Sequence, residues 1–410
     1  MPDRYDVAIA GAGPAGAQCA RDLAARNYDV VVLETEPEDE FPRQSNKSTA
    51  GTFPSMMASF GIPDDVVMSY TDNVVLESPN DHYESYQPGA VLEFAEFKRF
   101  LVEDGRESGA EYRFDSRVSR PILDDDGVIE GVKYAGDEEV YADVVVDATG
   151  PAAPIASALD VVDLERENQA IGIEYEMSGV DLDHPEFADL RRAMMLRLDH
   201  DIAPGGYSWI FATGEESAKV GICYIQNDRH REFAEDGQTV DGYLNEWIDR
   251  DPRFDGAEKI DGKIHRGSAH IQRPGQMHTD GFLAIGDTVP TIDPLWGEGI
   301  HKGMKSARAA AAAIDRCLTA EDRPTDAESL EIYDMLWHRD VAPRMNARLM
   351  LTELLYLAPN ERYDRLMRDL RRTDEDTLAK ANQGEKRSMA KLIHLGDLPL
   401  LTKYARERLE

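Results

Sequence analysis

Three glycines near the N-terminus have the spacing of a phosphate-binding turn. Gly11, Gly13 and Gly16 follow a predicted strand at residues 5–10, which ends in the apolar run 7–10, in the pattern G-x-G-x-x-G. In such a turn the first glycine permits a tight bend, the second lets the backbone approach a pyrophosphate, and the third lets helix and strand pack closely. Pro14 suits the first helical position, where its missing N–H costs nothing. Because the pattern stands between a predicted strand and a predicted helix, it indicates an adenine dinucleotide, either NAD or FAD.

An acidic residue lies where a ribose-binding carboxylate is expected. The second apolar strand, residues 30–33, ends in Glu34, 18 residues beyond Gly16. A carboxylate at this position accepts hydrogen bonds from the ribose hydroxyls and repels a phosphorylated ribose. Residues 5–34 therefore predict the strand–helix–strand unit around which the rest of the chain is organised.

A second constellation lies at residues 284–303, AIGDTVPTIDPLWGEGIHKG. Asp287 follows a buried strand, where it would bind a ribityl hydroxyl or reach the pyrophosphate through water. Pro294, Gly297 and Gly299 precede a predicted helix, whose first N–H groups would face the C2 oxygen of a flavin. The positive end of that helix would stabilise the negative charge of the reduced ring. This arrangement suits the flavin end of a long cofactor.

The remaining pattern predicts a nucleotide domain interrupted by a second domain. The β-branched run within residues 142–150 implies burial on both faces, so we expect it to join the first strand in a parallel sheet. From about Glu167, alternating strands indicate an antiparallel sheet covered on one face. The other predicted elements are strands at 74–77 and 83–86, a helix at 94–108, an antiparallel meander at 111–114, 118–123, 127–134 and 139–141, strands at 170–177, 194–198, 207–213 and 219–224, a helix at 299–318, and mostly helices at 326–410.

Three aromatic residues alternate along one of these strands. Tyr207, Trp209 and Phe211 occupy every second position, so they share one face. Such a row is either part of the core or the lining of an apolar cavity. As a lining it would suit a prenyl chain, because each buried CH₂ contributes roughly 0.8 kcal/mol.

The composition is strongly acidic. Asp and Glu number 79 against 45 Lys and Arg, a formal net charge of −34 spread evenly along the chain. This charge strains a compact fold at low ionic strength, whereas molar salt shortens the Debye length to about 3 Å and screens the repulsion. We therefore expect a protein from a halophile. No basic patch is present to neutralise phosphates, so nucleic acid is disfavoured as a partner.

The sequence offers no pattern for a disulfide framework or a metal site. Cys19, Cys223 and Cys317 are far apart and form no C-x-x-C pair. No apolar run is long enough to span a membrane, and no basic-then-apolar leader precedes the first strand. We expect a cytoplasmic protein that can also rest peripherally on a membrane surface.

Taken together, these motifs resemble a known family. The glycine turn, Asp147-Ala148-Thr149-Gly150 and Gly286-Asp287 with Pro294-x-x-Gly297-x-Gly299-Ile300 are similar to the glutathione-reductase type of FAD fold, in its aromatic-hydroxylase-like branch. The stretch 204–211, PGGYSWIF, is similar to the P-x-x-Y-x-W-x-F motif of the geranylgeranyl reductases, which lines the isoprenoid cavity in that family. The resemblance covers roughly residues 1 to 320.

The resemblance implies a mixed α/β, FAD-binding fold with an antiparallel-sheet substrate domain and a helical C-terminal region. The expected segments are 1–70, 94–166 and 263–320 for the FAD-binding domain, 71–93 and 167–262 for the substrate domain, and 321–410 for the C-terminal helices. It assigns FAD binding to Gly11, Gly13, Pro14, Ala15, Gly16, Glu34, Thr35, Arg43, Ala148, Gly150, Gly286, Asp287, Pro294, Gly297, Gly299 and Ile300. It assigns substrate binding to Tyr207, Trp209 and Phe211.

The implied reaction is saturation of isolated C=C bonds in polyprenyl chains of archaeal lipids or their precursors. Hydride would come from reduced FAD, cationic character would develop at a tertiary carbon, and a proton would complete the reduction. The sequence does not reveal the proton donor; Tyr207, Trp209 and His301 are the catalytic candidates. The sequence has no second G-x-G-x-x-G for NAD(P)H. The resemblance implies NAD(P)H, bound transiently, or a ferredoxin as the electron donor.

Two positions depart from the family pattern. The loop at residues 45–51, SNKSTAG, lacks the Cys-Gly pair found in many relatives, so a thiol mechanism at that loop is excluded. Phe94 occupies a place where relatives tend to carry Arg. Lys98 and Arg99 lie nearby, and we expect both to be exposed helix charges.

Two other classes of function remain open. A flavin monooxygenase or halogenase would share the fold, although the tryptophan halogenases carry W-x-W-x-I-P, which residues 207–211 do not match. A non-enzymatic prenyl-binding protein would share the cavity, but the intact glycine turn and Gly286-Asp287 argue against it.

Overall fold

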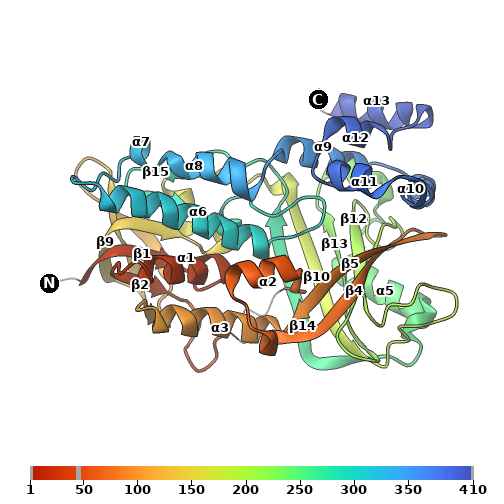
Figure 1. Cartoon of the computed structure of the whole chain (residues 1–410), viewed down its shortest axis with the longest axis horizontal. Helices are drawn as coiled ribbons and strands as arrows, with labels where there is room; N and C mark the ends of the chain where they lie inside the picture. The colour runs from red at the N-terminus through yellow and green to blue at the C-terminus, as the bar shows by residue number, and fades with distance from the viewer. Residues whose placement is uncertain (1–2, 43–47, 408–410) are drawn as a thin grey trace. The chain divides into compact units, whose positions relative to one another are not determined.

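The computed structural model describes residues 3–42 and 48–407. The chain forms two compact units, each assembled from three segments (Figure 1). The first unit comprises Met1–Asn46, Ala95–Glu165 and Gln272–Pro343; the second comprises Lys47–Phe94, Arg166–Ile271 and Arg344–Glu410. Residues 47–70 and 263–271, which we expected in the nucleotide domain, thus group with the second unit.

The first unit is built on a largely parallel sheet. Its strand order is β15-β16-β9-β1-β2-β6, and β8 joins β9 to β7. The central strands β1 and β9 pair in parallel, with Val7 opposite Val144 and Ile9 opposite Val146. Both strands are apolar and buried where they pair, as the β-branched run predicted. The strands are β1 (Asp3–Ala10), β2 (Val30–Leu33), β6 (Glu111–Arg113), β7 (Val118–Leu123), β8 (Ile129–Tyr134), β9 (Glu138–Asp147), β15 (His278–Thr279) and β16 (Phe282–Ala284).

Helices complete the first unit. α1 (Pro14–Ala24) and α6 (Ile300–Thr319) pack side by side, and small residues allow the approach (Figure 1). A Cβ added at Gly303 of α6 would be in ordinary van der Waals contact with the Cβ of Ala15, at 3.7 Å. The other helices are α3 (Phe94–Glu107), α4 (Pro154–Ala158), α7 (Ala327–Leu330), α8 (Ile332–Leu336) and a π-turn at Trp337–Val341.

One part of the predicted meander is wrong. The strand β6 does not pair with β7 but runs parallel to β2, with Val32 opposite Tyr112. The reason is topological, because a strand that follows a crossover helix returns in parallel. The separately predicted strands at 139–141 and 142–150 are one continuous strand, β9.

The second unit contains an eight-stranded sheet in the order β14-β10-β13-β12-β11-β4-β5-β3. All its pairings are antiparallel except β11 with β4. One face of the sheet packs on a hydrophobic cluster that includes Ile173, Ile210, Val220 and Trp247. The strands are β3 (Gly51–Thr52), β4 (Val67–Glu77), β5 (His82–Leu92), β10 (Gln169–Ser178), β11 (Ala193–Arg197), β12 (Gly206–Ala212), β13 (Ser217–Ile225) and β14 (Glu258–His270).

Two elements of this sheet differ from the prediction. The hairpin strands β4 and β5 extend beyond the predicted ranges, with irregular pairing at Val67–Ser69 and Thr71–Asn73 that breaks the alternation. The strand β14 was missed altogether. Most of its residues are exposed because it is an edge strand, so it lacks the apolar alternation that marks a half-buried strand.

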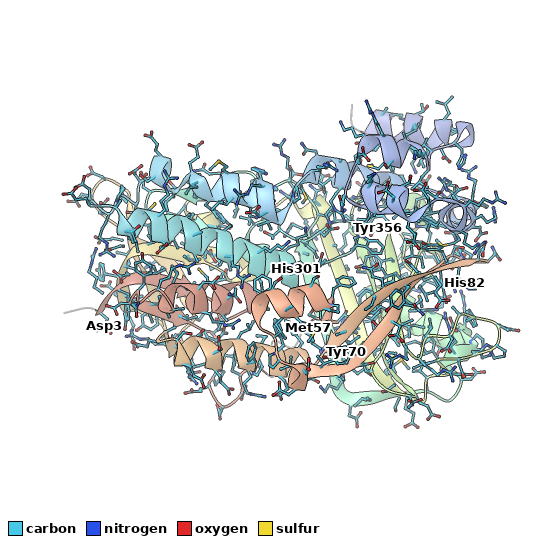
Figure 2. All side chains as sticks on the ribbon, viewed as in Figure 1. Asp3, Met57, Tyr70, His82, His301 and Tyr356 are labelled. Atoms are coloured by element: carbon cyan, nitrogen blue, oxygen red, sulfur yellow. The ribbon has the colours of Figure 1, made fainter. Side chains whose placement is uncertain are left out.

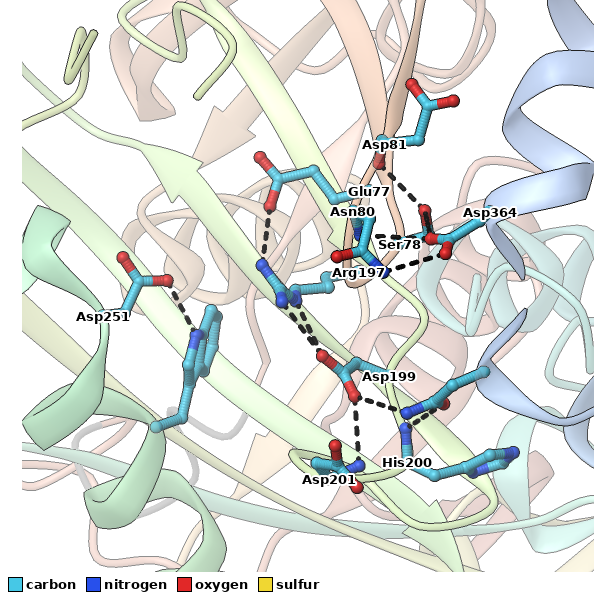
Figure 3. Close-up of polar contacts among 12 residues, drawn as sticks. Glu77, Ser78, Asn80, Asp81, Arg197, Asp199, His200, Asp201, Asp251 and Asp364 are labelled. Atoms are coloured by element: carbon cyan, nitrogen blue, oxygen red, sulfur yellow. Dashed lines mark hydrogen bonds and ion pairs between the residues drawn. The ribbon is translucent and has the colours of Figure 1, made fainter. Parts of the chain in front are cut away.

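Helix α10 of the second unit is hydrogen-bonded to the β4–β5 hairpin. Asp364 on α10 accepts hydrogen bonds from Ser78 Oγ (2.7 Å) and from Asn80 N (3.1 Å) and Nδ2 (2.9 Å) (Figure 3). At the ends of β4 and β11, Arg197 lies between Glu77 and Asp199 (Figure 3). The helices are α2 (Pro54–Phe60), α5 (Val240–Arg250), α9 (Met345–Tyr356), α10 (Asn360–Arg372), α11 (Glu375–Asn382), α12 (Lys386–Ala390) and α13 (Leu398–Glu407).

Candidate functional site

The glycines of the first turn meet two different requirements, which are close packing within the protein and space for a ligand. Gly11 has φ +97°, and a Cβ there would lie 2.7 Å from the carbonyl oxygen of Ala148. A Cβ at Gly16 would lie 2.0 Å from the carbonyl oxygen of Gly11. Gly13 differs, because its φ of −68° suits any residue and a Cβ there would meet no described atom within 4 Å. The protein's own packing thus requires Gly11 and Gly16, whereas the space beside Gly13 is left open for a ligand.

The N-terminus of α1 is available to an anion. Gly13 is its N-cap and Pro14 follows at the first position; no side chain among the described residues caps it, and its first turn holds no acid. The first N–H groups of a helix lack intrahelical partners and carry a partial positive charge. This turn can therefore hold a pyrophosphate.

Glu34 lies beside the same turn, as predicted. Its Oε2 accepts a hydrogen bond from Ala12 N (2.7 Å) and its Oε1 one from Glu36 N (3.0 Å). These bonds orient the carboxylate, whose remaining lone pairs can accept from ribose hydroxyls. Thr35 is exposed. Arg43, also predicted to bind the cofactor, lies outside the described residues.

The loops that follow β9 and β16 meet at this turn. Ala148 N donates to Ala10 O (2.9 Å), and Gly150 N donates to Thr288 Oγ1 (3.1 Å). Gly286 has φ +59°, and a Cβ there would lie 2.7 Å from the Cβ of Ala15. Ala15, Ala148, Gly150 and Gly286 are therefore brought together, as predicted.

Asp147 has a structural role in this arrangement. It is fully buried, and its two oxygens accept hydrogen bonds from Thr149, from Ile155 N and from Ala156 N. Burial raises the pKa of Asp147, and the hydrogen bonds oppose the rise. With its oxygens so engaged, Asp147 shapes the loop after β9.

Asp287, in contrast to Asp147, is not fully hydrogen-bonded within the described part of the chain. Its Oδ1 is buried and has no hydrogen-bond partner in the described part of the chain. Burial raises its pKa from 3.8 to about 6. A Cβ at Gly299 would lie 3.6 Å from Oδ2, so the N-terminus of α6 is close by. A buried carboxylate oxygen without a donor fits a bound group that brings a hydroxyl, such as the ribityl chain of FAD.

The predicted flavin-facing segment ends at the N-terminus of α6. Asp293 organises it by accepting hydrogen bonds from Leu295 N (3.1 Å) and Trp296 N (3.2 Å). Gly297 adopts φ +64°, and Gly299 is the N-cap of α6, which no described side chain caps. The first N–H groups of α6, beginning at Ile300, can therefore face a negatively charged ring edge.

His301, on the first turn of α6 (Figure 2), is held by a carboxylate. Its Nδ1 lies 2.8 Å from Oε1 of Glu298. The ring is therefore oriented by its neighbour in the loop. Pro294, in the same loop, is buried.

The three predicted substrate residues share one face of β12. Their neighbours Ser208, Ile210 and Ala212 point to the opposite face, where Ile210 and Ala212 join the hydrophobic core. Tyr207 and Phe211 are half-buried, whereas Trp209 is 8% exposed. Glycines of neighbouring strands make room, because a Cβ at Gly221 would lie 2.3 Å from the Trp209 ring and one at Gly51 would lie 2.6 Å from the Phe211 ring.

Sequence reasoning missed the charged residues on this aromatic face. Glu174, Glu176, Lys219 and His265 are all buried, and the indole Nε1 of Trp209 donates to Glu174 Oε2 (2.9 Å). A signal was present, since the glutamates alternate with apolar residues in QAIGIEYEMS. Alternation inside a predicted strand places both carboxyls on one face.

The structure corrects the prediction for Lys98. We expected an exposed helix charge, but Lys98 is 4% exposed and its Nζ lies 4.7 Å from the centre of the Phe41 ring. The reason is helical spacing, because Lys98 is four residues from Phe94 and three from Leu101 and so lies on the buried stripe of α3.

Among the described residues, no group of His, Cys, Asp and Glu is arranged to hold a metal ion. Within the same ranges, every helix is too short or too polar to cross a membrane.

Comparison with known proteins agrees with this geometry. The FAD binding domain family matches residues 4–333. A digeranylgeranylglycerophospholipid reductase of Haloferax volcanii is 64% identical, over 99% of this chain and 99% of that protein. Digeranylgeranylglycerophospholipid reductase 2 of Methanopyrus kandleri is 28% identical over 98% of each chain.

Solved structures share the fold. A geranylgeranyl bacteriochlorophyll reductase-like protein of Thermoplasma acidophilum superimposes with a TM-score of 0.82 at 20% identity, over 96% of this chain and 100% of that one. A flavin-dependent brominase gives a TM-score of 0.74 at 19% identity, over 93% and 94%. With the family match over most of the chain, the expected fold and cofactor are confirmed, and FAD is the cofactor. The chain belongs to the FAD binding domain family and, within it, to the digeranylgeranylglycerophospholipid reductases, which are FAD-dependent oxidoreductases.

Proposed function

We propose that the protein saturates C=C bonds in the geranylgeranyl chains of archaeal glycerophospholipids or their precursors. The observation that carries the proposal is the 64% identity with the Haloferax volcanii reductase over 99% of both chains. The aromatic face of β12 supports it independently, since it offers the half-buried rings of Tyr207 and Phe211 and the buried ring of Trp209, with glycines beside them.

The residues of the first unit fit the cofactor at both of its ends. The turn at Gly13 and the N-terminus of α1 would hold the pyrophosphate, and Glu34 a ribose. Asp287 would accept a ribityl hydroxyl, and the N-terminus of α6 would stabilise negative charge at the pyrimidine edge of the flavin. When bound and reduced, FAD supplies the hydride that the saturation requires.

Tyr207, Trp209 and Phe211 would bind the prenyl chain. At roughly 0.8 kcal/mol per buried CH₂, such a chain contributes on the order of 10 kcal/mol after losses. Affinity would then come from the tail. Exclusion of water from the same face would favour a reaction in which cationic character develops on a carbon atom.

The experiment that tests this function is an anaerobic assay. The protein, purified in molar KCl, is reduced chemically and mixed with digeranylgeranylglycerophospholipid, and the lipid is analysed by mass spectrometry. We expect a gain of two hydrogens for each double bond. An unchanged lipid beside reduced cofactor that reacts only with oxygen would contradict the proposal and favour the monooxygenase or halogenase class.

Two finer points belong to the proposal. We propose NAD(P)H or a ferredoxin as the electron donor, and anaerobic mixing of the oxidised protein with each one identifies it by loss of the yellow colour. We also propose peripheral contact with the membrane through the C-terminal region, where Leu398 at the start of α13 is 64% exposed and Ile393, between α12 and α13, is 41% exposed. Flotation with vesicles of archaeal lipids, compared between wild type and a Leu398→Asp variant, tests the contact.

A further inference from the structure

One buried carboxyl group on the aromatic face of the second sheet has an unused oxygen. Across the adjacent strands β12, β13 and β10 (Figure 1), Trp209 lies opposite Gly221, and Gly221 lies opposite Glu174. Because Gly221 has no side chain, the indole of Trp209 extends over it and Nε1 donates to Glu174 Oε2 at 2.9 Å. Trp209 therefore orients the carboxyl group of Glu174.

The other oxygen of this group is left without a bond. Glu174 is 3% exposed, and its Oε1 is buried with no hydrogen-bond partner in the described part of the chain. An unsatisfied buried oxygen costs free energy, so a native structure that retains one calls for an explanation. A carboxyl group that accepts an N–H at Oε2 and carries a proton at Oε1 would use both oxygens, provided that a ligand lies against Oε1.

The charged neighbours of Glu174 are engaged elsewhere. His265 of β14 lies opposite Glu174 in the strand register, yet its Nε2 is 3.0 Å from Glu176 Oε1. Lys263 Nζ is 3.6 Å from the same oxygen. Lys219 of β13 is fully buried, and its Nζ donates to the carbonyl oxygens of Thr49 (3.1 Å) and Leu92 (3.3 Å).

The surroundings of Glu176 favour its charged form. Burial acts to raise its pKa, but the hydrogen bond with His265 and the charges of Lys219 and Lys263 outweigh burial and lower the pKa. Two carboxyl groups on one strand face with such different hydrogen-bond partners are suited to different roles.

We propose that Glu174 donates the proton that saturates the C=C bond, and that Trp209 is its positioning residue. This inference rests on the proposed function. The O–H bond at Glu174 Oε1 breaks and a C–H bond forms at the less substituted alkene carbon. The tertiary carbon gains cationic character and accepts the hydride supplied by the reduced cofactor. The carboxylate of Glu174 then regains a proton from solvent, so atoms and electrons balance.

The test compares wild type with Glu174→Gln, and uses Glu176→Gln as the matched control on the same strand face. Glutamine keeps an acceptor for Trp209 Nε1 but cannot donate a carboxyl proton. We expect Glu174→Gln to retain bound FAD, thermal stability and lipid affinity within about threefold. Without oxygen, the rate at which the lipid oxidises the reduced cofactor of this variant should fall by about 10² to 10⁴-fold, which is the usual contribution of a general acid. Its oxidation by oxygen should be unchanged.

Infrared spectroscopy of the FAD-loaded protein adds a readout that does not depend on turnover. Wild type and Glu176→Gln should show the C=O stretch of a buried protonated carboxyl, and Glu174→Gln should lack it. Trp209→Phe should shift that band to higher frequency, since the C=O loses its hydrogen bond. Absence of the band in wild type, or lipid-dependent oxidation of Glu174→Gln within fivefold of wild type, would overturn the inference. A wild type that shows the band but leaves the lipid unsaturated would overturn the proposed function instead.

Discussion

Gly13 and Gly16 occupy the same turn, but only Gly16 is required by the protein's own atoms. A methyl group at Gly16 would overlap the carbonyl of Gly11, whereas one at Gly13 would enter open space. The two positions therefore separate the demands of the fold from those of the cofactor.

We predict that Gly13→Ala destabilises the FAD-free protein by no more than about 1 kcal/mol, because alanine is a poorer N-cap residue than glycine but its methyl group would meet no described atom within 4 Å. FAD affinity should fall at least about tenfold, since the methyl group stands where the pyrophosphate approaches. Denaturant unfolding and flavin fluorescence titration measure the two effects. Gly16→Ala is the contrasting variant and should lose about 1–3 kcal/mol or more through overpacking. Wild-type FAD affinity in Gly13→Ala would contradict the assignment.

Asp287 gives a prediction with opposite signs for stability and binding. Because burial raises its pKa to about 6, the folded FAD-free protein binds a proton that the unfolded chain has released. This contribution to stability is full below about pH 4 and is lost as pH rises towards 6. Asp287→Asn should therefore match wild type near pH 4 and exceed it by up to about 3 kcal/mol above pH 6.

The same variant should weaken FAD binding, because the amide replaces the carboxylate acceptor. Denaturant unfolding of the FAD-free protein across this pH range, in constant salt, measures the stability difference. A variant that is less stable than wild type at pH 8 would show that Asp287 has a partner within the fold.

Arg253 joins secondary-structure elements of the second unit. It is 1% exposed and bonds to Glu77 at the end of β4 (2.9 and 3.2 Å) and to Asp251 after α5 (3.0 and 2.8 Å). Burial acts to raise the pKa of Asp251, but the bonds and charge of Arg253 outweigh it and the pKa lies below its usual range. The strand end and the helix end are thus held through buried charges.

We predict that Arg253→Met destabilises the protein by about 3–5 kcal/mol at pH 7, because two buried carboxylates each lose a charged partner. The difference from wild type should shrink as pH falls below about 4, where a carboxyl with a depressed folded pKa takes up its proton. Arg253→Lys, which keeps the charge but not the planar fork, should lose less. Chemical denaturation at about pH 3 and about pH 7 tests both variants, and a loss below about 1 kcal/mol at pH 7 would argue against a stabilising network.

At the scale of the whole molecule, the net charge is the dominant influence on the stability of the fold. With a formal charge of −34, self-repulsion should destabilise the fold unless salt screens it. Raising KCl from about 0.1 M to 1 M shortens the Debye length from about 10 Å to 3 Å, so we predict a rise in melting temperature over this range. Calorimetry with sucrose at matched osmolality is the control. An equal rise in sucrose would mean that preferential exclusion, and not screening, stabilises the fold.

The sequence by itself determined the family, the cofactor and the local elements of the proposed cofactor site. Each of these depends on residues close together in the chain, such as the glycine turn, Glu34 and the loop before α6, and local spacing is enough to specify a strand, a turn and a helix N-terminus. The parallel pairing of the β-branched run was likewise predictable, because burial on both faces follows from composition.

Tertiary structure alone decided the pairings that join distant segments. The strand β6 pairs with β2, and the exposed edge strand β14 joins the second sheet, neither of which local periodicity reveals. The bond from Trp209 to Glu174 crosses two strand pairings, so only the register of the sheet brings the indole to the carboxyl group. The structure likewise reveals that Asp147 is satisfied while Asp287 is not, since burial and hydrogen bonding depend on every element that surrounds a side chain.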